Sequence, residues 1–138
     1  MEFITTNSKK KIKIVPASFK DQLELKNAFW GVLKENPDIT NIFKEGDNNL
    51  DGAIRGILFA DTSETFIKQV FVCLESCIYE DAKKVNELLF EDEPDLREDY
   101  YEIIFECCKV NLTPFFKSLS SAFLKVFEQT QSENQKQK

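Results

Sequence analysis

The residues whose types and spacing could do chemistry lie in the stretch 47–58, which has the layout of a calcium-binding loop. Five positions match that layout: Asp47, Asn49, Asp51, Gly52 and Ile54. The twelfth position, which should supply a bidentate glutamate, is Leu58, and the ninth is the cation Arg55. We therefore predict a polar turn, in which Asp and Asn bond to the nearby backbone, and keep a calcium-linked switch as the weaker alternative.

The four cysteines are the next candidates, because thiolates bind zinc and act as nucleophiles. Cys73 and Cys77 are four residues apart, and Cys107 and Cys108 are adjacent. The sequence has no Cys-x-x-Cys and no histidine, so it lacks both the spacing of a structural zinc site and an imidazole base. It also lacks a Gly-rich phosphate loop and a Gly-x-Ser-x-Gly motif. We therefore predict buried, reduced thiols, no metal, no cofactor and no enzymatic activity.

The elements that position these residues belong to one domain, which we expect over residues 11–128, between a flexible N-terminus (1–10) and a disordered polar tail (129–138). Of the 138 residues, 42% are hydrophobic and 30% charged, enough for a single core, and the net charge of −6 argues against nucleic acid as a partner. No apolar run approaches a membrane span, and the N-terminal lysines follow the apolar patch, unlike a secretory signal. We expect an intracellular protein that binds no membrane.

The apolar periodicity predicts a mainly α fold, a compact helical domain of four to five helices with a short N-terminal β-strand. The strand is "KIKIV" over 11–15, whose partner is a segment in the middle of the chain, a second copy or another protein. Helices are expected over 18–36, 62–78 and 95–110, and a further one from Pro114 onward. Residues 82–90 fit either a short helix or an irregular arm.

The stretch "KVNLTPFFKSL" (109–119) separates the last two of these helices. Thr113 is predicted to cap the new helix, and Pro114 falls at its first position, where the missing N–H costs nothing. An apolar stripe follows, made of Phe115, Phe116, Leu119, Ala122, Phe123, Val126 and Phe127. We interpret Phe115 and Phe116 as core anchors, and replacing either by alanine should cost about 3 to 5 kcal/mol if it is buried.

Charge is distributed unevenly along the chain. Residues 1–35 carry seven lysines against four acids, whereas residues 80–106 carry eleven acids against three basic residues. An acidic face attracts a basic partner at long range. The densest acidic run holds the predicted partner-binding residues Glu91, Asp92, Glu93 and Asp95.

Three segments also carry a family pattern: "KIKIVPASFKDQLELKNAF", "CLESCIYE" and "DLREDYYEIIFECCKVNLTPFFKSL". The shared positions are Pro16, Ala17 and Phe19, then Asp99, Tyr100 and Glu102, then Asn111, Leu112, Pro114, Phe115, Phe116 and Lys117. With these segments the sequence resembles small proteins from the tail-morphogenesis modules of long-tailed bacteriophages, in particular tail assembly chaperones. The resemblance extends over most of residues 11–120.

The resemblance implies a mostly helical, non-enzymatic chaperone that coats the tape-measure protein before the tail tube polymerises around it. Such a protein acts in many copies in the cytoplasm of the host bacterium, with self-association as a further option. The alternative function is a virion structural component or a tail completion protein.

Overall fold

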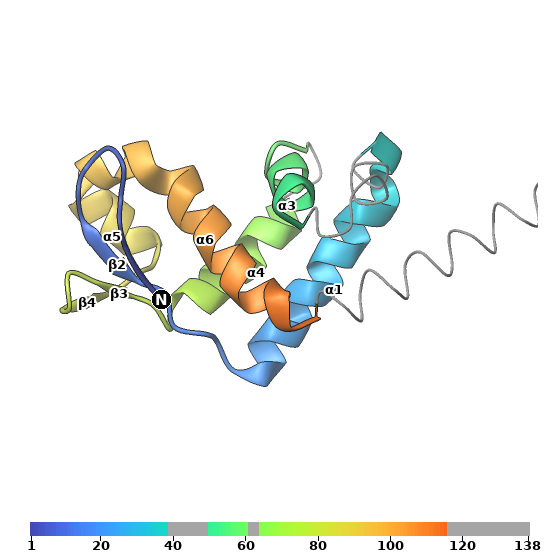
Figure 1. Cartoon of the computed structure of the whole chain (residues 1–138), viewed down its shortest axis with the longest axis horizontal. Coiled ribbons are helices and arrows are strands. Elements are labelled where there is room, and N and C mark those ends of the chain that lie inside the picture. The colour runs from blue at the N-terminus through green and yellow to red at the C-terminus, as the bar shows by residue number, and fades with distance from the viewer. Residues whose placement is uncertain (39–49, 61–63, 116–138) are drawn as a thin grey trace, which may run out of the picture.

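The computed structural model describes residues 1–38, 50–60 and 64–115, which form a mainly helical domain with a small sheet at one end (Figure 1). The helices are α1 (Phe19–Glu35), α3 (Leu50–Leu58), α4 (Glu64–Leu74), α5 (Glu87–Asp92) and α6 (Tyr100–Leu112), with 3-10 helices η1 (Pro94–Asp99) and η2 (Thr113–Phe115). The strands are β1 (Glu2–Ile4), β2 (Lys11–Lys13), β3 (Ile78–Tyr79) and β4 (Lys83–Lys84). The predicted helical class is confirmed, and none of the described helices could span a membrane.

The core forms where α6 packs against α1, α3 and α4, and where α1 packs along α4 (Figure 1). The rings of Phe29 on α1 and Phe66 on α4 are both fully buried, with their centroids 6.1 Å apart. All four cysteines are free and buried in the same core, as predicted. Burial raises the pKa of the Cys73 thiol to about 12, so this group stays protonated and packs as a small apolar side chain.

Helix α1 begins and ends where its local sequence predicts. The hydroxyl of Ser18 accepts a hydrogen bond from the backbone N–H of Asp21 at 3.2 Å, which satisfies one free donor of the first turn. Asn36 is the C-cap of α1, and Pro37 follows it directly. The proline ring disfavours helical backbone angles at the preceding residue, so the helix ends there. Phe19 in the first turn is 69% exposed.

The single predicted strand is one member of a four-stranded antiparallel sheet in the order β1-β2-β3-β4. Strand β2 pairs with β1 on one side and with β3 on the other, so a segment in the middle of the chain is indeed its partner. Residues 2–4, which the sequence placed in a flexible N-terminus, form β1 because their backbone groups bond to β2. Residues 82–90 resolve into β4 and the start of α5, whose N-cap Asn86 accepts from Leu89 N–H at 3.0 Å.

The junction after α6 differs from the predicted one. Thr113 has helical backbone angles, and its hydroxyl donates to the carbonyl of Lys109, so it extends α6 through η2 rather than capping a new helix. Pro114 is exposed and Phe115 is half-buried, so neither is a core residue. Phe116, the expected helix beyond it and the polar tail lie outside the described residues.

We expect Phe115→Ala to lower the free energy of unfolding by about 1 kcal/mol, less than a fully buried phenylalanine would lose. Its ring centroid lies 6.3 Å from that of Phe19, and this pair contributes little beyond the area it covers. Urea denaturation followed by circular dichroism measures the change. A loss above about 3 kcal/mol would show that Phe115 is a core anchor after all.

Candidate partner-binding groove

Asp99 holds the loop between β1 and β2 against the start of α6, and its side chain is only 1% exposed. Its two carboxylate oxygens accept from Asn7 N–H at 2.9 Å and from Ser8 N–H at 2.8 Å, and the Ser8 hydroxyl donates to it at 2.5 Å. One turn further, the Glu102 carboxylate accepts from Thr6 N–H at 3.2 Å. Two signature residues of the sequence pattern are therefore structural clamps on the N-terminal segment.

These bonds predict an acid-sensitive fold. Burial by itself would raise the pKa of Asp99, but the hydrogen bonds from Ser8, Asn7 and Thr5 outweigh it and lower that pKa below its ordinary value. A carboxylate with a lowered folded-state pKa contributes its full stability above its unfolded pKa, about 3.9, and loses it as the pH falls through the folded value. In urea unfolding, the stability advantage of the wild type over Asp99→Asn should therefore shrink from pH 7 to pH 3. If the difference in unfolding free energy between the wild type and Asp99→Asn stays constant between pH 7 and pH 3, the Asp99 carboxylate does not stabilise the loop in this way.

Asn111, another signature residue, joins the start of α1 to the end of α6. Its side-chain oxygen accepts from Ala17 N–H at 2.9 Å and from the Gln22 amide at 3.1 Å. Its side-chain nitrogen donates to the Cys107 carbonyl at 2.9 Å. Asn111 is fully buried, so these hydrogen bonds take the place of the hydrogen bonds to water that its amide and the Ala17 N–H make in the unfolded chain.

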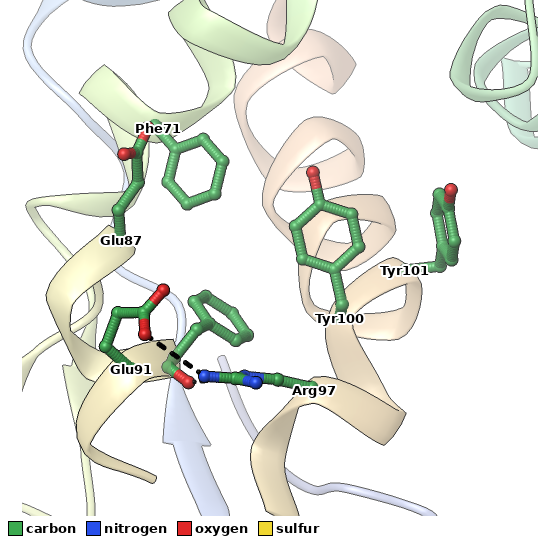
Figure 2. A pocket seen from close by; sticks show the side chains of 7 residues that line it. Phe71, Glu87, Glu91, Arg97, Tyr100 and Tyr101 are labelled. Carbon is green, nitrogen blue, oxygen red and sulfur yellow. Dashed lines mark hydrogen bonds and ion pairs between the residues drawn. The ribbon is translucent and has the colours of Figure 1, made fainter. Parts of the chain in front are cut away.

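An aromatic hollow of about 370 Å³ opens where α4, α5 and η1 meet the first turn of α6 (Figure 2). The rings of Phe71, Phe90 and Tyr100 pack against one another, with centroids 5.6 to 6.3 Å apart. Arg97 closes one wall, because its guanidinium donates to the Phe90 carbonyl at 2.9 Å and lies 3.2 Å from the Glu91 carboxylate. Tyr101 lines the hollow beside Tyr100, on the side away from Glu87 and Glu91 (Figure 2).

A second hollow of about 500 Å³ lies on the other side of Tyr101, between α3, α6 and the loop that Asp99 and Glu102 hold. Phe59 and Tyr101 are 71% and 51% exposed, and their ring centroids are 5.1 Å apart. Arg55 lies over the ring of Phe105, 5.0 Å from its centroid. Tyr101 lines both hollows, so they are neighbours, and we call the two together the aromatic groove: Phe59, Phe71, Phe90, Tyr100, Tyr101 and Phe105 with the charged residues around them.

The rim of the aromatic groove is acidic. Glu87 and Glu91 line the first hollow, and Glu102 and Glu106 line the second. The two arginines of the rim are already engaged, Arg97 with Glu91 and Arg55 with the ring of Phe105. Neither Glu87 nor Glu106 forms an ion pair with another residue that the structure describes, so one free carboxylate borders each hollow. The groove therefore presents apolar rings framed by negative charge.

The four acids that the sequence put forward do not form one surface in the structure. Glu91 lines the aromatic groove and Asp92 borders a separate hollow beside Lys83 and Lys84. Glu93 is half-buried at the C-cap of α5, where its N–H donates to the carbonyl of Leu89, and Asp95 is exposed on η1. Of the four, the structure places only Glu91 in the groove.

Sequence reasoning did not single out Phe59 and Tyr101, the most exposed rings of the groove. Tyr101 belongs to an apolar arc on α6 that is too wide for one neighbour to cover, and this width was the available signal. Phe59 directly follows the buried Leu58, at the point where α3 ends. No pattern in the sequence distinguishes Phe59 from the other twelve phenylalanines.

The calcium-like stretch has a different arrangement where it can be followed. Asp51 and Gly52 lie inside α3, which begins at Leu50, so neither occupies a ligand loop. The Asp51 carboxylate instead lies 3.7 Å from the Lys109 ammonium on α6. Asp47 and Asn49 lie outside the described residues. Across the described part of the chain, no group of three or more Cys, Asp or Glu side chains is arranged to hold a metal ion.

The chain is a small, mainly helical protein with two neighbouring aromatic hollows on its surface. A family model described as phage tail assembly chaperone protein, TAC, matches residues 8–124. Because that match spans most of the 138 residues, the chain belongs to the phage tail assembly chaperone family. No curated protein and no solved structure matches it significantly.

Proposed function

We propose that this chain is a non-enzymatic tail assembly chaperone that binds the tape-measure protein of its phage through the aromatic groove. The observation that carries the proposal is an open, ring-lined groove on a member of a chaperone family. Exposed rings such as Phe59 and Tyr101 are costly in water, and contiguous apolar surface on a soluble protein marks a site of interaction.

The charge of the chain supports this role. A chaperone must cover apolar segments of its partner without itself aggregating, and a net charge of −6 keeps separate copies apart. The acids around the groove, including Glu87 and Glu106, attract basic segments of a partner to the rings and repel acidic ones. The place of action is the cytoplasm of the infected bacterium, and the chaperone acts in several copies on each long partner.

Co-expression with the tape-measure protein of its own phage, followed by size-exclusion chromatography with light scattering, tests the proposal. We expect a soluble complex with more than one chaperone per tape-measure chain, because a long segment offers repeated binding sites. An insoluble tape-measure protein, or two species that elute separately, would contradict it.

Mass spectrometry of purified virions separates the chaperone from a structural component of the tail. A chaperone leaves before the tail is complete, so its peptides should be absent from mature particles. Their presence at the level of structural tail proteins would instead favour the virion function.

A further inference from the structure

We propose that the aromatic groove binds an amphipathic α-helix of the tape-measure protein, with apolar side chains on one face and lysine or arginine at both ends of that face. This inference rests on the proposed function and specifies the chemistry of the bound segment. It follows from three features of the groove: its helical walls, the positions of its two hollows along α6, and the carboxylates of its rim.

The groove cannot hydrogen-bond an extended peptide as a sheet edge would. None of the residues that line its two hollows belongs to the described strands β1–β4. Its walls are mostly helices, whose interior backbone groups already bond within the helix. An extended segment buried there would leave its own N–H and C=O groups without partners, whereas a helix satisfies its own.

The two hollows lie within two helical turns of each other along α6. Tyr100 lines the first hollow and Glu106 the second, six residues apart on α6, which is roughly 9 Å along the axis at about 1.5 Å per residue. Apolar side chains at positions i and i+7 of a partner helix lie roughly 10 Å apart. In the proposed complex, two turns of a partner helix that runs along α6 place one anchor in each hollow, on either side of Tyr101.

The charges of the rim specify the ends of the helix. Glu87 at the first hollow and Glu106 at the second are free of ion pairs with described residues, while Arg97 and Arg55 are engaged. A lysine or arginine beside each anchor would pair with these carboxylates at the solvent-accessible rim of the apolar contact, where charge pairs contribute specificity more than affinity. A partner helix with acids at those positions would be repelled.

The first test compares capture of the co-expressed tape-measure protein by three forms of the chaperone. The double variant Phe59→Ser/Tyr101→Ser should recover at least about tenfold less partner than the wild type, because it removes two central aromatic anchors. The control is Phe19→Ser, an equally exposed phenylalanine that does not line the groove. Failure of the wild type to capture any partner would overturn the proposed function itself, whereas equal capture by all three forms would overturn only the groove.

A charge variant keeps the test independent of folding. Glu87→Lys/Glu106→Lys changes two exposed or half-exposed side chains, and its thermal melt should show a cooperatively folded protein, slightly less stable because Glu87 lies in the first turn of α5. We expect it to reduce capture about tenfold and to weaken the dependence of capture on salt concentration. Undiminished capture would contradict the proposal that the partner helix carries lysine or arginine at both ends of its apolar face.

Cross-linking identifies the occupant. A photoreactive phenylalanine analogue at position 59 should cross-link to tape-measure segments whose apolar residues recur every three to four positions, and a synthetic peptide of that segment should gain helical circular dichroism on mixing. Cross-links at position 59 to a second copy of the chaperone, or a peptide that stays non-helical when bound, would overturn the inference.

Discussion

Replacing Asp99 with alanine is expected to lower the free energy of unfolding by about 3 to 5 kcal/mol, the larger of the two major effects that this structure predicts. The variant removes an acceptor of three hydrogen bonds from Asn7 and Ser8, and a bond to a charged group contributes about 1.5 to 3 kcal/mol. The sum is less than additive because the three bonds belong to one network. Urea denaturation at pH 7 measures the loss.

Two further variants test whether the loss comes from the clamp. Asp99→Asn keeps the volume and one oxygen acceptor, so it should lose about half as much as alanine. Glu98→Ala alters the neighbouring, exposed carboxylate and should stay within about 0.5 kcal/mol of the wild type. A loss below about 1 kcal/mol for Asp99→Ala would show that the loop is held by other contacts.

The same variant should also weaken partner capture, because the loop that Asp99 holds is part of the groove. Thr6 lines the second hollow, and its N–H is fixed by Glu102 one turn along α6. When the loop detaches, this wall of the aromatic groove is no longer positioned. Asp99 in the family pattern is therefore understandable as support for a groove that it does not itself line, whereas Glu102 both holds the loop and lines the second hollow.

Asn111→Ala should cost about 2 to 4 kcal/mol. The substitution leaves the buried N–H of Ala17 and the carbonyl of Cys107 without their side-chain partner, and an unsatisfied buried polar group costs about 1 to 3 kcal/mol. The lost volume adds to this cost because the surrounding core is closely packed. Chemical denaturation gives the change in stability, and hydrogen exchange should show the Ala17 amide losing protection.

Gln22→Ala is the matched control for Asn111. It removes only the amide that donates to the Asn111 oxygen at 3.1 Å, from a half-buried side chain, so the expected loss is about 0.5 to 1 kcal/mol. Should Asn111→Ala prove no more destabilising than Gln22→Ala, the buried amide would not join α1 to α6 in the way described.

Local sequence signals predicted α1 well, but they missed α3, where a polar turn was expected, and most of the sheet. The Ser18 cap and the Asn36-Pro37 stop act within one turn of α1, so their effect can be read from adjacent residues. Strand β2 instead depends on β1 and on β3, and β3 lies more than sixty residues away in the chain. A three-residue strand acquires its structure from its neighbours, which is why "EFI" at residues 2–4 was expected to be flexible.

The candidate site divides in the same way. Glu91 was predicted from the acidic run and does line the groove, whereas Asp92, Glu93 and Asp95 follow it in sequence but point to other surroundings. Consecutive residues on short helical turns face different directions, so an acidic run in the sequence is not an acidic surface. Phe115 was expected in the core and is half-buried, because α6 continues through Thr113 instead of ending there.

The sequence by itself determined that this protein is acidic and mainly helical, because composition and apolar period are properties of the chain alone, and its match to a family model places it in the phage tail assembly chaperone family. Only the tertiary structure decided what the motif residues do. Asp99 and Asn7 are 92 residues apart, and Asn111 and Ala17 are 94 apart, yet each pair is joined by a hydrogen bond. The aromatic groove likewise exists because the helices α3, α4, α5 and α6 and the 3-10 helix η1 meet there, and this meeting depends on packing between distant segments rather than on any local pattern.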